Sequence, residues 1–265
     1  MDLYDKILRS KPFFLIAGPC VIESYDIVRE VARELTELTS QRGILFIFKS
    51  SYLKANRTSE TSYSGPGPEE GLKILAMIKE EFGIPILTDI HESDEAEAAS
   101  TVADIIQIPA FLSRQTFLLK AAARTQKIIN IKKGQFMAPE DMKAVTEKVV
   151  SENNSRILLT ERGTFFGYHN LVVDFRSFPI MRQIGYPVVF DITHSLQMPS
   201  ISKVSGGSPE LAPMLAKAAM ATGMVQGIFL ETHPEPSEAL SDGMSMIRLD
   251  LIAQILDDLL GNRER

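Results

Sequence analysis

The chain has 265 residues, 45% of them hydrophobic, and a formal net charge of −6 at pH 7. Such a composition is typical of a globular protein with a full core, and the lack of tryptophan and of a basic–aromatic stripe argues against nucleic-acid binding. No apolar run approaches the roughly 18 residues of a membrane span, and the N-terminus shows no signal-peptide pattern, so we expect a cytoplasmic protein outside the membrane. Cys20 is the only cysteine, which excludes an intrachain disulfide. Since no linker divides the chain, we expect one domain over residues 1–265.

Eight short runs rich in apolar, β-branched and aromatic residues recur along the chain and predict parallel strands buried on both faces. They cover residues 13–17, 44–49, 85–90, 104–109, 128–133, 156–162, 187–193 and 227–232. Helical patterns lie between them: Ser24 is a predicted N-cap, Gly83 a predicted helix stop, and further helices are expected over residues 139–150, 211–222 and 247–260. Eight such units predict an α/β fold of the (β/α)8 TIM-barrel type. A doubly wound open sheet is the alternative, but no GxGxxG motif opens the first strand–helix turn.

Polar side chains follow the predicted strands at their carboxyl ends, which form the active site in barrels of this type. One group is cationic and suits phosphates and carboxylates, because Arg binds planar oxyanions bidentately and Lys acts as a point charge. Its members follow the second, fifth and sixth strands: Lys49, Lys54, Arg57, Lys132 and Arg162. Because the whole chain is acidic, this local basic cluster indicates a small anionic ligand.

A second group combines soft and hard metal ligands. Its members are Cys20, His194, Glu231 and Asp242. A thiolate, an imidazole and two carboxylates suit Zn²⁺, Fe²⁺ or Mn²⁺ better than Mg²⁺. These residues lie far apart in the sequence, so spacing alone leaves a second interpretation open, in which His194 is a hydrogen-bonded imidazole at the barrel mouth.

Motifs along nearly the whole chain, from about residue 14 to residue 242, resemble the 3-deoxy-D-manno-octulosonate-8-phosphate synthase (2-dehydro-3-deoxyphosphooctonate aldolase) family. They are IAGPCVIES, FKSSYLKANRTS, TDIHES, DIIQIPAFLSRQT, NIKKGQF, LTERGTFFGYHNLVVDFRS, DITHSLQ and LETHPEPSEALSDG. The related 3-deoxy-D-arabino-heptulosonate-7-phosphate synthases usually read KPRTS where this chain reads KANRTS, so Asn56 favours the octulosonate enzymes. The resemblance implies a transferase that condenses phosphoenolpyruvate with D-arabinose 5-phosphate and water for lipopolysaccharide biosynthesis.

The resemblance also implies roles for individual residues. Those expected to bind phosphoenolpyruvate are Lys54, Lys132, Arg162 and the backbone at Ala110. Those expected to bind the sugar phosphate are Asn56, Arg57 and Thr58. Those expected to line the sugar and enol region are Lys49, Asp89, Gln107 and Gln197. The expected catalytic residues are Cys20, Lys54, Asp89, Lys132 and His194. Since the family forms homotetramers, Arg114 is expected to reach a phosphate across a subunit boundary.

The family has metal-dependent members, with a cysteine after the first strand, and metal-independent members, with an asparagine there. The resemblance therefore implies a divalent ion held by Cys20, His194, Glu231 and Asp242. Residues 198–211 depart from the Gly- and Asp-containing loop often found in the family before SGG. Two alternatives stay open: a related condensation with another acceptor, such as erythrose 4-phosphate, and a non-catalytic barrel that binds sugar phosphates.

Overall fold

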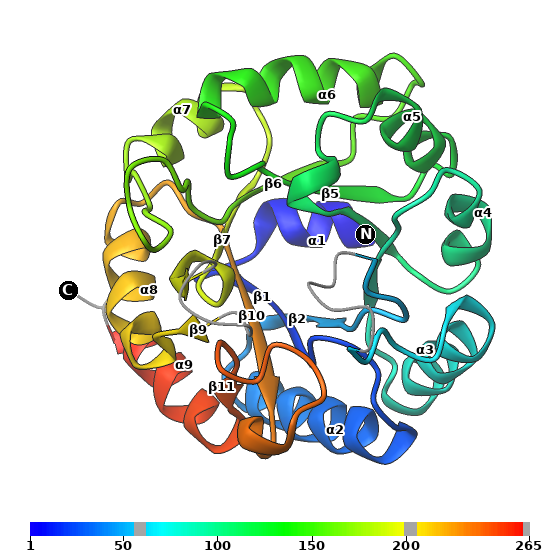
Figure 1. The fold of residues 1–265 in the computed structure, drawn as a ribbon, viewed down its shortest axis with the longest axis vertical. Helices are drawn as coiled ribbons and strands as arrows, with labels where there is room; N and C mark the ends of the chain where they lie inside the picture. The colour runs from blue at the N-terminus through cyan, green and yellow to red at the C-terminus, as the bar shows by residue number, and fades with distance from the viewer. Residues whose placement is uncertain (56–61, 199–205, 262–265) are drawn as a thin grey trace.

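The apolar runs of the sequence form a ring of parallel strands with helices around it (Figure 1). The computed structural model describes residues 1–55, 62–198 and 206–261. The barrel strands are β1 (Phe14–Gly18), β2 (Leu45–Lys49), β3 (Ile86–Asp89), β4 (Ile105–Ile108), β5 (Ile128–Lys132), β6 (Ile157–Glu161), β7 (Val188–Asp191) and β10 (Gly227–His233). Neighbours in this order pair in parallel, and β1 also pairs with β10, which closes the ring. The predicted (β/α)8 barrel is confirmed, and the open sheet is wrong.

Helices between the strands cover the outside of the ring. They are α2 (Tyr25–Gln41), α3 (Pro68–Phe82), α4 (Glu95–Ser100), α5 (Thr116–Arg124), α6 (Met142–Val150), α7 (Ser177–Gln183), α8 (Ala212–Ala221) and α9 (Ile252–Gly261). Their apolar faces pack on the outward-facing strand residues. Together they form a hydrophobic cluster between the helices and the strands, in which α2, for example, buries Val28, Val31 and Leu35. As predicted, the Ser24 hydroxyl caps α2, and Gly83 ends α3 in the left-handed conformation with φ +63°.

The N-terminal helix α1 (Leu3–Arg9) closes the amino end of the barrel. Its Ile7 is fully buried against inward-facing side chains of all the barrel strands. These side chains, which we call the apolar floor, are Phe14, Ile16, Ile47, Leu87, Ile105, Ile128, Leu158, Val189 and Phe229. The apolar floor and α1 fill the amino end of the barrel, so the buried polar side chains lie toward its carboxyl end.

Strand alternation builds a polar layer directly above the apolar floor. Side chains of a strand point alternately in and out, so the residue two positions beyond a floor residue also points inward. In β2, Ile47 belongs to the floor and Lys49 lies above it; in β10, Glu231 follows Phe229 in the same way. The buried polar layer comprises Lys49, Asp89, Gln107, Asn130, Lys132, Thr160, Asp191 and Glu231.

The structure differs from the sequence-based prediction at the starts of three helices. The predicted helices at residues 139–150 and 211–222 begin with short 3-10 turns, η2 (Pro139–Asp141) and η4 (Pro209–Leu211). The predicted start at residue 247 is wrong, because β11 (Ile247–Arg248) pairs with β10 as an added strand and α9 begins only after η6 (Leu249–Leu251). A short antiparallel pair, β8 (Gln197–Met198) and β9 (Gly206–Gly207), lies between η3 (His194–Leu196) and η4. Among the residues that the structure describes, no helix is both long and apolar enough to cross a membrane.

Candidate active site

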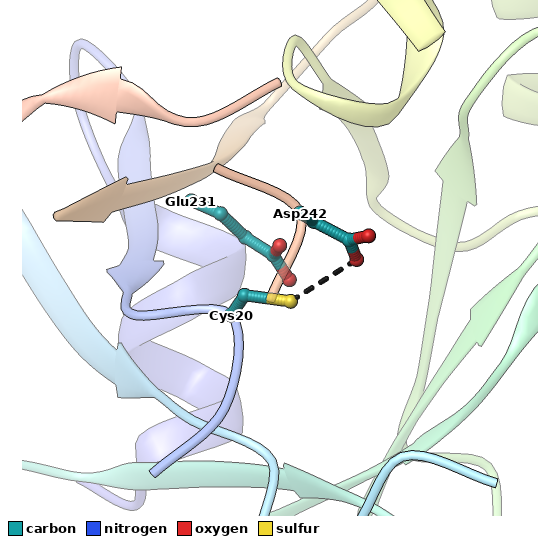
Figure 2. Close-up of side chains that lie close together, drawn as sticks. All are labelled: Cys20, Glu231 and Asp242. Atoms are coloured by element: carbon teal, nitrogen blue, oxygen red, sulfur yellow. Dashed lines mark hydrogen bonds between the residues drawn. The ribbon is translucent and has the colours of Figure 1, made fainter. Parts of the chain in front are cut away.

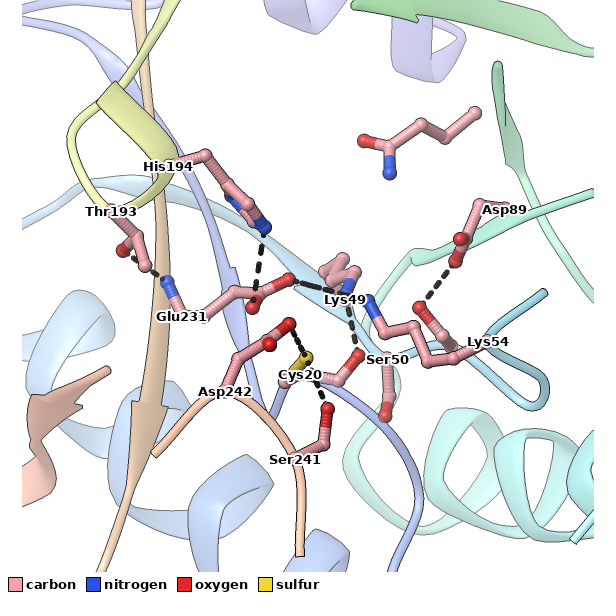
Figure 3. Close-up of polar contacts among 12 residues, drawn as sticks. Cys20, Lys49, Ser50, Lys54, Asp89, Thr193, His194, Glu231, Ser241 and Asp242 are labelled. Atoms are coloured by element: carbon pink, nitrogen blue, oxygen red, sulfur yellow. Dashed lines mark hydrogen bonds and ion pairs between the residues drawn. The ribbon is translucent and has the colours of Figure 1, made fainter. Parts of the chain in front are cut away.

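Charged side chains converge inside the carboxyl end of the barrel (Figure 3). Lys49 on β2 is 0% exposed and Lys132 on β5 is 5% exposed. Lys49 Nζ lies 2.7 Å from Glu231 Oε1, and Lys132 Nζ lies 2.6 Å from Asp191 Oδ2. Charges taken out of water need a partner, so these two ion pairs explain how the barrel holds cations at its centre.

Cys20, Glu231 and Asp242 come together from opposite ends of the chain (Figure 2). One ligand atom of each residue lies within 4.8 Å of the other two. Cys20 Sγ is 3.2 Å from Asp242 Oδ2 and 3.1 Å from the Ser241 hydroxyl. Cys20 and Glu231 are buried, each with 1% exposure. These three residues form a group that could hold a metal ion.

A close approach between β1 and β2 delivers Cys20 to this group. A Cβ atom on Gly18 would lie 2.0 Å from the Lys49 carbonyl oxygen, so only glycine fits at this point. Cys20 follows, and its carbonyl accepts a hydrogen bond from Lys49 Nζ at 2.8 Å. The first two strands therefore place the thiol beside the Lys49–Glu231 pair.

The loop after β10 is folded tightly so that Asp242 faces Cys20. Asp242 has φ +48°, in the left-handed region that residues with a Cβ atom rarely adopt. A Cβ atom on Gly243 would lie 2.2 Å from the Pro236 carbonyl oxygen. Glu23, in the β1–α2 connection, accepts a hydrogen bond from the Leu240 backbone at 3.0 Å. The loop is therefore anchored to the same connection that carries Cys20.

The electrostatics of the Cys20–Glu231–Asp242 group favour a bound cation. Burial, and then the charge of Glu231, raise the pKa of the Cys20 thiol. Burial also opposes ionisation of Glu231, but Lys49 and His194 outweigh it and hold the pKa of Glu231 well below its usual value. Across the described part of the chain, Glu231 Oε2 is buried without a hydrogen-bond partner. The donor set fits Zn²⁺, Fe²⁺ or Mn²⁺, since coordination deprotonates a thiol and supplies a partner to a buried carboxylate oxygen.

Asp191 orients His194 beside this group. Asp191 is fully buried; its Oδ1 accepts the His194 backbone N–H at 2.8 Å, and its Oδ2 lies 2.8 Å from His194 Nδ1. With Nδ1 facing Asp191, the other ring nitrogen faces Glu231, at 3.6 Å from Nε2 to Oε2. Burial raises the pKa of Asp191, but the charges of His194 and Lys132 outweigh it, so the pKa lies below its usual value. His194 therefore lies next to the three-residue group, with the ring orientation that a metal ligand needs.

We expect Asp191→Asn to weaken metal retention by about ten- to a hundredfold. The amide keeps the size of the side chain but places an NH2 group against donors of His194 or Lys132, so the ring loses its fixed orientation. Metal content after dialysis against graded chelator measures the effect, and a melting curve checks the fold. Retention equal to that of the unmodified protein would show that Asp191 does not orient a ligand.

Arg162 indicates an anion site on the other side of the mouth. It follows β6, is 5% exposed, and its Nη2 donates to Gln197 Oε1 at 2.8 Å. Its Nε and Nη1 are buried and have no hydrogen-bond partner among the described residues. Burial lowers the pKa of this guanidinium. Since unpaired buried donors are costly, the arrangement favours an anion that accepts from Arg162, with Lys132 on the neighbouring strand.

Lys132 gains a further contact from the apolar floor. Its Nζ lies 3.7 Å from the centre of the Phe229 ring, close enough for a cation–π interaction. Burial lowers the pKa of Lys132 despite the nearby Asp191. The ammonium thus contacts the aromatic face of Phe229, the Asp191 carboxylate and, at 3.4 Å, Nδ1 of His194.

The other predicted residues of strands two to four also lie at the mouth. Lys54 Nζ is 3.9 Å from Glu231 Oε1, and Figure 3 shows Lys54 and Lys49 on the same side of that carboxylate. Asp89 accepts a hydrogen bond from the Ser51 hydroxyl at 2.5 Å and lies 3.4 Å from His91 Nε2. Gln107 is buried in the polar layer. Cationic and acidic side chains are therefore interleaved around the opening.

Several predicted residues are not brought into this cluster. Ala110 is buried at the start of η1 (Ala110–Leu112), after β4. Arg114 is exposed, and its carbonyl accepts a hydrogen bond from Lys148. Its contact across a subunit boundary stays a prediction. Residues Asn56, Arg57 and Thr58 lie outside the described residues, so their roles also stay predictions.

Sequence reasoning gave no role to four residues that shape the site: Asn130, Thr160, Asp191 and Ser241. For three of them the sequence indicated that the side chain points into the barrel. Each is two positions from a predicted site residue or from a residue of the apolar floor on the same strand, and such residues face the same side. Asn130 precedes Lys132 by two positions, Thr160 precedes Arg162 by two, and Asp191 follows Val189 by two. Ser241 carries no comparable signal, since its contact with Cys20 depends on how the loop folds.

The fold is that of a (β/α)8-barrel enzyme, with a group that could hold a metal ion and a buried arginine with two unpartnered nitrogens among the described residues. The chain belongs to the DAHP synthetase I family, which matches residues 6–261. The 2-dehydro-3-deoxyphosphooctonate aldolase of Geobacter sp. (strain M21) is 54% identical over 255 residues, covering 96% of this chain and 93% of the relative. The same-named proteins of Desulfatibacillum aliphaticivorans (51% over 254 residues, 96% and 93% coverage) and Xanthomonas campestris pv. campestris (strain B100; 53% over 251 residues, 94% and 91%) are similar. The family resemblance drawn from the motifs is confirmed.

Proposed function

We propose that the protein condenses phosphoenolpyruvate with D-arabinose 5-phosphate and water, giving 3-deoxy-D-manno-octulosonate 8-phosphate and inorganic phosphate for lipopolysaccharide biosynthesis. The observation that carries the proposal is the buried Arg162, with two unpartnered nitrogens among the described residues, beside Lys132. A small ligand with both a phosphate and a carboxylate suits that pair of cations. The names of the relatives support the same reaction.

The substrates would occupy different depths of the mouth. Phosphoenolpyruvate would lie against Lys132 and Arg162, with Lys54 and the backbone at Ala110 beside it. The sugar phosphate would extend outward to the residues proposed from the resemblance: Asn56, Arg57, Thr58 and Arg114 of another subunit. The reacting carbons would then lie among Lys49, Asp89, Gln107 and Gln197, the residues that the resemblance places at the sugar and the enol.

The reaction needs two anions held close together. The C3 carbon of phosphoenolpyruvate bonds to the aldehyde carbon, and the aldehyde oxygen takes up a proton. Water adds at C2 and gives up one proton, which balances the proton taken up by the aldehyde oxygen. The C2–O bond to phosphate then breaks and phosphate leaves with the electron pair, while the new C2 hydroxyl passes its remaining proton to the departing phosphate and C2 becomes a ketone. Lys132 and Arg162 offset the charge of the enol substrate, and burial keeps bulk water away. Asp89, held by Ser51 and His91, is the carboxylate that we place at the sugar as proton acceptor.

The divalent ion belongs to the same proposal. Cys20, Glu231 and Asp242 would hold it, with His194 as the fourth ligand expected from the resemblance. When bound, an ion of this kind supplies Lewis acidity to an aldehyde oxygen or to a water molecule. The protein's own part is to hold Glu231 through Lys49 and to orient His194 through Asp191.

We expect phosphoenolpyruvate consumption in the presence of arabinose 5-phosphate to stop after exhaustive chelation and to return with Zn²⁺, Fe²⁺ or Mn²⁺. The reason is that Glu231 and Asp242 of the Cys20–Glu231–Asp242 group lie close enough to Arg162 for their charges to act on it. Loss of the enol and release of phosphate are measured on one sample before and after chelation.

The other outcomes of this experiment separate the alternatives. If consumption survives chelation, the proposed reaction stands, but it does not need the metal ion. Consumption with erythrose 4-phosphate but not with arabinose 5-phosphate would favour the related condensation. Binding of sugar phosphates without turnover in the metal-replete sample would favour a non-catalytic barrel.

We also propose a cytoplasmic homotetramer in which residues 1–265 of each chain form one catalytic domain. Phe111 and Phe117 flank Arg114 and are 56% and 83% exposed, which supports an interface at the β4–α5 connection. Strands from Phe14 to His233 share one barrel, which supports a single domain. A light-scattering mass equal to that of one chain would contradict the tetramer.

A further inference from the structure

Three uncharged polar side chains form a row inside the barrel on neighbouring strands. Gln107 on β4, Asn130 on β5 and Thr160 on β6 are 3%, 0% and 0% exposed. Each lies two positions beyond a residue of the apolar floor, so each points inward. Burying an amide without hydrogen bonds is costly, and a buried amide pair therefore has a strongly preferred orientation.

The row is hydrogen-bonded in one direction. The Thr160 hydroxyl donates to Asn130 Oδ1 at 2.6 Å, and the Asn130 amide nitrogen donates to Gln107 Oε1 at 3.0 Å. An amide carries its donor and its acceptor on different branches, so engaging Gln107 Oε1 leaves the NH2 group of Gln107 for other partners. Reversing the Gln107 amide would set its NH2 against the NH2 of Asn130.

The row lies beneath the residues proposed to hold phosphoenolpyruvate. Lys132 follows Asn130 by two positions on β5, and Arg162 follows Thr160 by two positions after β6. Gln107 is in register with Asn130 on one side and with Asp89 on the other. The row and the two cations therefore belong to the same strands, and the ligand next to Gln107 is the one that Lys132 and Arg162 attract.

We propose that Asn130 and Thr160 are positioning residues that hold the Gln107 amide so that its NH2 group donates to an anionic oxygen of phosphoenolpyruvate. The inference rests on the proposed function. Gln107 touches the substrate, whereas Asn130 and Thr160 act through Gln107. A glutamine without this support can turn its carbonyl oxygen toward the same anion, which repels it.

The first variant removes the start of the row. Valine matches threonine in shape but has no donor, so Thr160→Val leaves Asn130 Oδ1 without its hydrogen bond. We expect the KM and the calorimetric Kd for phosphoenolpyruvate to rise about tenfold, with kcat and the KM for the sugar changed less than about twofold. Thr160→Ser keeps the hydroxyl and is expected to restore the KM of the unmodified enzyme. An unchanged KM in Thr160→Val would overturn the proposal.

A double-mutant cycle tests whether Thr160 acts through Gln107. These residues lie on β4 and β6 with β5 between them, and the hydrogen bonds that link them run through Asn130. Gln107→Met removes the donor that the row orients. We expect Thr160→Val to change the KM by less than about twofold when added to Gln107→Met. If the KM of the double variant changes by the product of the two single-variant factors, the proposal is contradicted.

The matched control is Thr39→Val on α2. Thr39 is 2% exposed and its hydroxyl donates to the Leu35 carbonyl at 2.6 Å, so the change removes an equally buried hydrogen bond outside the barrel. We expect a similar fall in melting temperature and an unchanged KM. Equal rises of KM in Thr39→Val and Thr160→Val would show a general loss of stability instead of positioning. If Thr160→Val does not fold, Thr160→Ala enters the same comparisons.

The unmodified enzyme is measured first, which separates the two proposals. If calorimetry shows that it binds phosphoenolpyruvate but it does not turn over with arabinose 5-phosphate, the proposed function fails. The Kd values of the variants then still test whether Asn130 and Thr160 position Gln107. If the unmodified enzyme turns over and the variants have the same KM and Kd for phosphoenolpyruvate, the positioning role of Asn130 and Thr160 is wrong and the proposed function stands. If it does not bind phosphoenolpyruvate, both are overturned.

Discussion

Cys20→Ala is expected to release the metal and to lower kcat/KM by at least about a hundredfold. The thiol is one of the three ligand atoms that lie within 4.8 Å of one another, and alanine offers no ligand in its place. Glu231, Asp242 and the proposed ligand His194 would remain, in a site whose affinity depends on a soft donor. Metal content by mass spectrometry and phosphoenolpyruvate consumption measure the two effects on the same sample.

Cys20→Ser is the matched variant for this experiment. Serine is similar in size and can keep the contact that Cys20 makes with the Ser241 hydroxyl, but it replaces a soft ligand by a hard one. We expect it to lose metal affinity as well, which would separate ligation from packing. Full turnover by metal-free Cys20→Ala protein would defeat the assignment of Cys20 as a ligand.

Arg162→Met is expected to raise the KM for phosphoenolpyruvate by about a hundredfold, without lowering the melting temperature. Arg162 is buried, and its Nε and Nη1 have no hydrogen-bond partner within residues 1–55, 62–198 and 206–261. Burial of a guanidinium with two unpartnered nitrogens costs stability in the free protein, and an anionic ligand would offset that cost. Methionine fills a similar space without charge, so the free protein should be as stable or more stable. Steady-state kinetics and a melting curve measure both quantities.

Arg42→Met is the control for the loss of an arginine. Arg42 Nε and Nη2 donate to Asp257 at 2.7 and 2.8 Å, on the outer surface between α2 and α9. Here a paired arginine is removed, so we expect a small fall in melting temperature and an unchanged KM. A larger loss of stability in Arg162→Met than in Arg42→Met would show that Arg162 has a structural role instead of a ligand-binding one.

The location of the site could be predicted from the strands, because parallel strands in a closed barrel deliver their last residues to one end. The apolar run ending at Phe48 places Lys49 at the mouth, and the run before Glu231 does the same for that carboxylate. The residue types alone suggested Cys20, His194, Glu231 and Asp242 as metal ligands, but they lie far apart in the sequence, so the resemblance was needed to favour that interpretation. The structure then brings Cys20, Glu231 and Asp242 into one group and leaves His194 beside it.

What the sequence could not provide depends on contacts between distant segments. Asp191 can be placed at a strand end, but its contact with Lys132 joins residues 59 positions apart. The orientation of Gln107 depends on partners on two other strands. The predicted helix from residue 247 failed for the same reason, because pairing with β10 outweighs the local helical spacing.

Closure of the barrel by its first and last strands makes the Cys20–Glu231–Asp242 group a late product of folding. Cys20 follows β1, whereas its contact Asp242 comes 222 residues later, beyond β10. On the ribosome the thiol emerges early, and the carboxylates emerge only when almost the whole chain has been made. A truncated or arrested chain therefore carries the thiol without the two carboxylates. If the group binds the proposed ion, that ion can be held by all three residues only after the last strand has entered the barrel, so we expect metal content to distinguish completed molecules from unfinished ones.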